Sequence, residues 1–182
     1  MSDSMCNRIN RWQLVSNLDP QEENVILKKF PGGTCDDLDW YSRRHLSLIR
    51  PSRFVLVCGT NDLPRHNGEA GLSEEEIAAK IIDIGRVARS FGTKEICISS
   101  IIDRRGVWFM RRICKVNSIL QAACLQEGFV FINNNNINLD FHTDGLHLND
   151  FGTAILKMNI LRCFYSFNPF FNDFLTIYDQ AY

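Results

Sequence analysis

This sequence lacks the features that would place it in a membrane or on nucleic acid. Its 182 residues contain no apolar run near the roughly 20 residues that a membrane-spanning helix needs. The formal charge of -1 and the pI near 6.4 provide no basic field of the kind that attracts nucleic acid. No cationic, apolar leader opens the chain. We therefore expect a cytoplasmic protein with no membrane span and no strong nucleic-acid signal.

Cysteine is present, but not in a metal-binding pattern. The seven cysteines form an odd count without a CxxC pair, and several fall on apolar faces, where a free thiol behaves as a small hydrophobe. This usage predicts a reducing compartment and no zinc. Cys58 lies inside an apolar run and is predicted to be inert, so a cysteine nucleophile is the weaker alternative. We expect no cofactor.

Four short apolar segments alternate with helical patterns along one domain of ordinary size. Alternation of this kind favours a parallel sheet with helices on both faces, and ligands of such sheets bind at the carboxyl ends of the strands. The pattern over residues 36–49 predicts a further, weaker helix. The expected strands are Asn24–Phe30, Phe54–Cys58, Glu95–Ile102 and Phe129–Ile132.

Capping residues punctuate the expected helices. Ser73 and Glu76 have the spacing of a capping box, and Gly92 ends the helix that follows. A second apolar stripe at helical spacing runs toward Gly128, which closes it. Asn149 can cap a third helix.

Small and polar residues follow three of the strands. Gly33 comes after the first strand and Asn61 after the second, while Asp144 and His147 come after the last. In a parallel sheet these positions meet at one edge. Each also has a simpler interpretation, because glycine, asparagine and aspartate are common turn residues and a lone histidine is often a surface or capping residue.

Taken together, these residues suit acyl transfer. Ser4, in the run SDSM ahead of an expected helix, offers a nucleophile, although a serine there can also be a helix cap or part of a frayed end. A serine needs a base within about 3 Å, and His147 oriented by Asp144 supplies one. The backbone amide of Gly33 and the side-chain amide of Asn61 suit a developing oxyanion, to which the Ser4 amide could add a third donor.

A metal site is the alternative for part of this set. His142, Asp144 and His147 lie close together in the sequence and could ligate a metal ion. Three ligands on one loop without a fourth are weak evidence, so the triad interpretation is preferred.

The ordered set SDSM, PGG, GTND and DGLHLN resembles the SGNH hydrolases, also called the GDSL-like esterase family. The similarity covers roughly Ser2 to Phe164 and is strongest in VLVCGTND and DGLHLNDFG. It implies a flavodoxin-like three-layer α/β/α fold and cofactor-free hydrolysis of a small-molecule ester. The segment ISSIIDRRG is similar to versions of this domain in mobile-element-derived proteins of animals. The resemblance implies a nucleophile, its base, the partner of that base and two oxyanion donors: Ser4, His147, Asp144, Gly33 and Asn61.

The sequence departs from the family pattern at its start. Ser2 stands where the family has glycine, and only three residues precede Ser4, too few for a central strand of about five to six residues. A missing central strand leaves its neighbours without hydrogen-bond partners. Either the chain is a truncated product or another segment, such as Phe174–Tyr178, fills the gap.

These departures define the second hypothesis for function. It is a catalytically impaired SGNH-like binding or assembly module, for example a fragment of a mobile-element protein. We assign residues 1–164 to the hydrolase-like domain. Residues 165–182 form an aromatic C-terminal tail of different composition.

Overall fold

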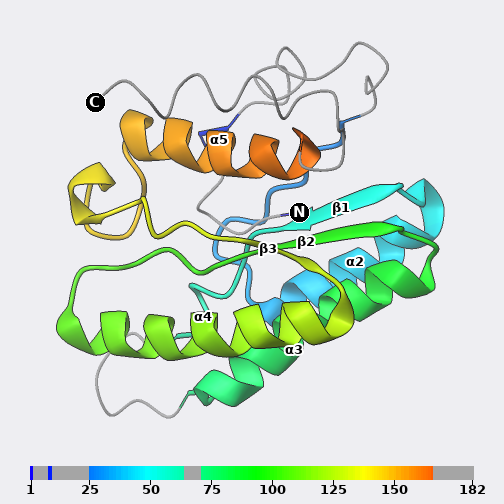
Figure 1. The fold of residues 1–182 in the computed structure, drawn as a ribbon, viewed down its shortest axis with the longest axis horizontal. Helices are drawn as coiled ribbons and strands as arrows, with labels where there is room; N and C mark the ends of the chain where they lie inside the picture. The colour runs from blue at the N-terminus through cyan, green and yellow to red at the C-terminus, as the bar shows by residue number, and fades with distance from the viewer. Residues whose placement is uncertain (2–7, 10–24, 64–70, 166–182) are drawn as a thin grey trace.

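The computed structural model describes residues 1, 8–9, 25–63 and 71–165 (Figure 1). Within these ranges, three strands form a parallel sheet in the order β1-β2-β3. The strands are β1 (Arg53–Leu56), β2 (Glu95–Ser99) and β3 (Val130–Ile132). The helices are α2 (Cys35–Ile49), α3 (Glu74–Ser90), α4 (Val107–Glu127) and α5 (Asp150–Tyr165), with a short 3-10 helix, η3 (Leu139–Phe141), ahead of α5.

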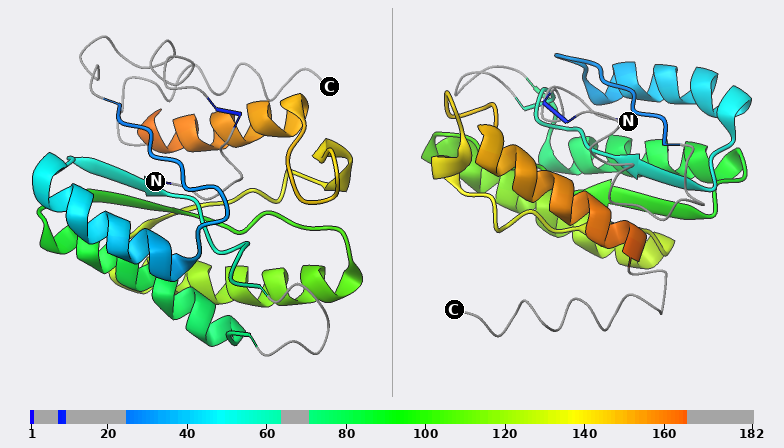
Figure 2. Two further views of the ribbon diagram at one scale, coloured as in Figure 1. Left: turned by 180° about the vertical axis from the view of Figure 1, so that it is seen from behind. Right: turned by 90° about the horizontal axis from the view of Figure 1, so that it is seen from above.

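Helices cover both faces of this sheet. Helices α2, α3 and α4 lie on one face and α5 lies on the other (Figures 1 and 2). Successive strand residues point to opposite faces, so Leu56 packs in the core beneath the three helices while Val57 packs with α5. This arrangement confirms the expected parallel sheet with helices on both faces, a three-layer α/β/α fold. No helix in the described ranges is both long enough and apolar enough to cross a bilayer.

The predicted caps are confirmed. The Ser73 side chain accepts from the Glu76 amide, and the Glu76 side chain accepts from the Ser73 amide in return. Gly92 (φ +92°) and Gly128 (φ +67°) follow α3 and α4 in the left-handed region. Asn149 caps α5 by accepting the Gly152 amide at 2.9 Å. Helix α2, the weaker candidate, begins with a capping box of its own at Thr34.

The expected strand over Asn24–Phe30 is wrong for its described part. Residues 25–30 form no regular strand, and only Lys29 makes a single bridge. A parallel strand needs a continuous neighbour to exchange hydrogen bonds with. The segment Phe174–Tyr178 lies outside the described residues, so its proposed place in the sheet stays a prediction.

Met1 occupies the edge of β1 that faces away from β2. Its amino group donates to the Val55 carbonyl at 2.7 Å, and its carbonyl accepts from the Val57 amide at 3.0 Å. Contacts to residues two apart on the neighbour are the pattern of a parallel ladder. Met1 therefore continues the sheet by one residue beside the last residue of β1.

Candidate active site

Asp144 and His147 form a hydrogen-bonded pair in the loop between η3 and α5. His147 Nδ1 lies 2.7 Å from Asp144 Oδ2. The other carboxylate oxygen, Oδ1, accepts the amides of Leu146 at 2.9 Å and of His147 at 2.7 Å. Both side chains are about half exposed. The carboxylate is thus fixed by its own loop while the imidazole faces solvent.

The loop around this pair is closed on itself. The Thr143 amide donates to the His147 carbonyl at 2.7 Å, and His142 forms an antiparallel bridge with Leu148. Gly145 turns the chain between Asp144 and His147 at φ +84°, a conformation that glycine adopts without strain. The predicted dyad therefore has a rigid local frame.

The electrostatics of the pair suit His147 to act as a base. The contact with the His147 ring and the two amides lower the pKa of Asp144, which keeps it a carboxylate at neutral pH. A carboxylate beside Nδ1 holds the proton on that nitrogen and leaves Nε2 as an acceptor. Nε2 has no hydrogen-bond partner among the described residues. The pair can therefore act as an oriented general base.

Gly33 and Asn61 are brought together, although the strand expected ahead of Gly33 does not form in its described part. Asn61 Nδ2 donates to the Gly33 carbonyl at 3.0 Å, which uses one of its two amide hydrogens. The Gly33 amide donates to the Phe30 carbonyl at 2.9 Å in the turn that contains Pro31. Asn61 is therefore the donor that keeps a hydrogen for a ligand, whereas the Gly33 amide is already engaged.

Asp62 anchors the loop that carries Asn61. Both of its carboxylate oxygens accept the Cys35 amide, at 3.0 and 3.1 Å, at the start of α2. Burial raises the pKa of Asp62, and the Cys35 contact opposes that shift. The loop after β1 is thus tied to the helix that follows Gly33.

Two consecutive arginines connect the Asn61 loop to the dyad loop. Arg104 donates from its guanidinium to the Thr60 carbonyl at 3.0 Å, and the backbone amide of Arg105 donates to the Gly145 carbonyl at 2.8 Å. Adjacent Cα atoms are about 3.8 Å apart, so one dipeptide after β2 touches both loops. The carboxyl ends of β1 and β3 thus share one edge of the sheet, and the loops beyond β2 and β3 lie together in Figure 1.

The arginine link is what the sequence did not reveal. Nothing in the local sequence distinguishes an arginine that bridges two loops from any other basic residue. The position of the pair directly after the strand Glu95–Ser99, opposite two glycine-containing loops, is the signal that was available.

The remaining candidates are the nucleophile, the metal site and a cysteine thiolate. Ser4 lies outside the described residues, so its role stays a prediction. Among the described residues no group of three His, Cys, Asp or Glu side chains could hold a metal ion, so the structure does not support the alternative of a metal site that includes His142. A hydrogen bond with Cys58 and burial raise the pKa of the Cys35 thiol, which argues against a thiolate beside the Asn61 loop.

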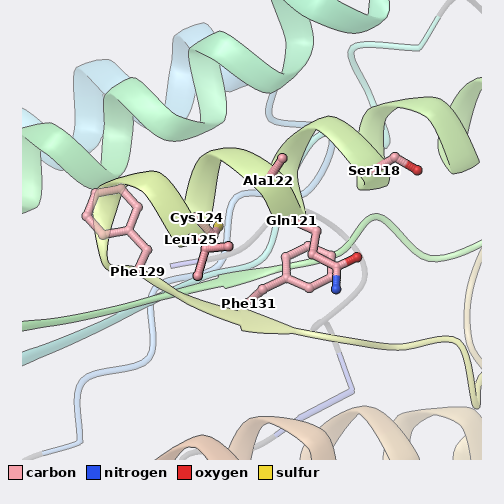
Figure 3. Close-up of a pocket in the computed structure, with 7 residues that line it drawn as sticks. All are labelled: Ser118, Gln121, Ala122, Cys124, Leu125, Phe129 and Phe131. Atoms are coloured by element: carbon pink, nitrogen blue, oxygen red, sulfur yellow. The ribbon is translucent and has the colours of Figure 1, made fainter.

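A hollow of about 500 Å³ lies elsewhere, between the second half of α4 and β3. Phe129 and Phe131 flank Leu125 in it (Figure 3). None of its lining residues belongs to the loops that hold the dyad or Asn61, so it is separate from the candidate active site.

Neither a protein-family model nor a curated protein matches the sequence. Solved structures match it in fold. A proposed acylhydrolase from Bacteroides fragilis aligns with a TM-score of 0.76 at 15% identity, over 91% of this chain and 85% of that chain. A GDSL-like lipase from Bacteroides thetaiotaomicron aligns with a TM-score of 0.73 at 15% identity, over 91% and 86%.

An acetyl xylan esterase gives a TM-score of 0.75 at 13% identity, over 88% of this chain and 96% of that chain. The narrower resemblance to mobile-element-derived proteins has no support among these structures. The agreement extends over most of each chain, and at this identity it establishes architecture. The chain therefore has the three-layer α/β/α fold of GDSL-like lipases and acylhydrolases.

Proposed function

We propose that this chain is an SGNH-type hydrolase that cleaves a small-molecule ester. One observation carries the proposal: His147 is held through Nδ1 by a carboxylate that two backbone amides fix in place. An exposed ion pair alone would say little about function. At the carboxyl edge of a parallel sheet, His147 has one nitrogen anchored and the other without a partner among the described residues, which suits general-base chemistry.

The reaction runs in two steps. Ser4 Oγ attacks the ester carbonyl while His147 Nε2 takes its proton, and Asp144 stabilises the imidazolium that forms. The imidazolium then returns the proton to the leaving alcohol, and an acyl-serine remains. Water, activated by His147 in the same way, releases the acid and restores Ser4.

The position of Met1 is compatible with a nucleophile at Ser4. Met1 pairs beside the last residue of β1, so the chain leaves Met1 at the carboxyl end of the sheet. Three further residues span at most about 11 Å. That reach is compatible with a nucleophile near the Asn61 and dyad loops.

Asn61 and Gly33 are the proposed oxyanion donors. Asn61 has one amide hydrogen left after its bond to the Gly33 carbonyl. The Gly33 amide now donates to the Phe30 carbonyl. To donate to the oxyanion it must leave that carbonyl, which requires a rotation of the turn. A donor aimed at the developing charge lowers the barrier by about 3–4 kcal/mol.

The structural neighbours support the reaction class. A proposed acylhydrolase, a GDSL-like lipase and an acetyl xylan esterase share the fold over most of their length. Their names concern ester or acyl substrates, which agrees with the chemistry that the dyad permits.

A fluorophosphonate probe tests the proposal directly, because it reacts with an activated serine. We expect covalent labelling of the native chain, with the modified peptide containing Ser4, and no labelling of Ser4→Ala or His147→Gln. Ser118→Ala is the matched control, because Ser118 is an exposed serine on α4 that bonds only the Cys114 carbonyl. Circular dichroism melts establish that each variant is folded.

One observation favours the second hypothesis, an impaired binding or assembly module. The Gly33 amide is already bonded to Phe30, so a predicted oxyanion donor is not free. A folded native chain that takes up no probe would reject the hydrolase and leave this module. Labelling that depends on both Ser4 and His147 would reject the module.

A further inference from the structure

The side chain of Arg105 begins at the turn of the dyad loop. Its backbone amide donates to the Gly145 carbonyl at 2.8 Å. A Cβ placed on Gly145 would lie 2.7 Å from Arg105 Cβ and 3.1 Å from its Nε. Only glycine leaves that space, so the absence of a side chain at residue 145 lets the arginine stem pass over Gly145, the residue that follows Asp144.

The guanidinium of Arg105 has no protein partner in the described ranges. It is exposed, and neither Asp103 nor Asp144 forms an ion pair with it. Asp144 gives its oxygens to His147 and to two backbone amides instead.

Several described arginines of the chain are partnered. Arg104, the preceding residue, donates to the Thr60 carbonyl and lies 4.3 Å over the Phe109 ring. On α3 and α4, Arg89 pairs with Glu127 and Arg112 pairs with Glu74. Among the described residues, Arg105 is thus a cation without a side-chain partner that lies beside the candidate base.

We propose that Arg105 binds an anionic group of the substrate and so selects esters that carry a carboxylate near the scissile bond. The inference rests on the proposed function and names its substrate class. A guanidinium presents parallel N–H donors that match the two oxygens of a carboxylate. The Arg105 stem lies against Gly145, so its guanidinium belongs to the same edge of the sheet as the dyad loop, where the proposed reaction takes place.

Such a contact acts on binding rather than on chemistry. It is present in the substrate complex and in the transition state alike, so its loss raises KM and leaves kcat nearly unchanged. A charged hydrogen bond at an exposed site is worth about tenfold in affinity. The effect weakens with added salt, because exposed charges are screened.

Two esters of equal chain length separate charge from shape: the p-nitrophenyl half-ester of glutarate and p-nitrophenyl pentanoate. For Arg105→Gln we expect kcat/KM to fall about tenfold on the glutarate ester, through KM, and less than twofold on the pentanoate. Arg105→Lys should recover part of the loss. Arg50→Gln is the control, because Arg50 is an exposed arginine at the end of α2, at the opposite edge of the sheet.

The outcomes distinguish this inference from the proposed function. Hydrolysis of both esters without a preference that depends on Arg105 overturns the inference and leaves the hydrolase in place. Equal losses on both esters also overturn it, because they mark a structural role.

If neither ester is hydrolysed, the proposed function fails, and the role of Arg105 is then tested by the binding of a carboxylate ester. Monomethyl glutarate should then shift the His147 ring signals in NMR spectra of the native chain but not of Arg105→Gln. No shift in the native chain overturns the inference.

Discussion

Replacing Gly145 by alanine is a quantitative test of the contact that joins the dyad loop to Arg105. At φ +84° an L-residue is strained by about 1–2 kcal/mol, and the stiffer unfolded chain offsets about 0.4–1 kcal/mol of this. The new Cβ would also lie 2.7 Å from Arg105 Cβ, an atom that no side-chain rotation moves. Relief separates the two backbones and breaks the 2.8 Å bond between them, which costs about 1 kcal/mol.

The central values sum to a destabilisation of about 2 kcal/mol, which lowers Tm by about 4–8 °C in a chain of this size. Gly92→Ala is the matched control: its φ is +92°, yet a Cβ there meets nothing within 4 Å. It should lose only the strain, about 0.8 kcal/mol net. Urea unfolding followed by circular dichroism measures both variants. Equal free energies of unfolding for the two would refute the assigned contact.

Three further predictions concern the site and its support. Asn61→Ala removes the available oxyanion donor and should lower kcat by about 10²–10³ with little change in KM. Asp144→Asn should lower kcat by about 10³–10⁴, because an amide no longer fixes the proton on Nδ1. In the native chain the folded-state pKa of Asp144 lies below its unfolded value of about 4. The carboxylate therefore stabilises the fold above that pH, and this stabilisation is lost as the pH falls toward the folded-state pKa. The Tm gap between native chain and Asp144→Asn should therefore narrow from pH 7 to pH 3. Asn159→Leu leaves the buried side-chain oxygen of Asn134, Oδ1, unpaired and should destabilise the fold by about 1–3 kcal/mol, measured by urea unfolding.

Controls for these variants come from the same chain. Asn135→Ala changes an exposed asparagine of the same loop region as Asn134 and should leave stability within about 0.5 kcal/mol. A kcat for Asn61→Ala equal to that of the native chain would remove Asn61 from the oxyanion site. A Tm gap for Asp144→Asn that does not change with pH would contradict the stabilising role of the carboxylate.

Local signals were predictable from the sequence. The capping box at Ser73 and the glycines after α3 and α4 act through backbone groups within a few residues, so neighbouring residues in the sequence are enough to predict them. The pairing of Asp144 with His147 is local for the same reason, since only two residues separate them. These features were correct without knowledge of the tertiary fold.

Contacts between distant segments were not predictable in the same way. The strand expected over Asn24–Phe30 has the right residue types, but a strand also needs a partner, and its described part has no regular ladder. The bond from Asp62 to the Cys35 amide and the link through Arg104 each join segments 27 or more residues apart. The composition of the turn Gly59–Asp62 does not show which distant backbone group the Asp62 side chain will contact.

The pairing of Met1 with β1 has a practical consequence for work with this protein. Residues fused ahead of Met1 would start beside the stretch of β1 that ends at Val55, at the outer edge of the sheet. The fusion would also convert the terminal ammonium group that donates to Val55 into an amide. A purification tag at that end is therefore a change to the sheet, and tagged and untagged forms should be compared by their melting temperatures before any activity is assigned.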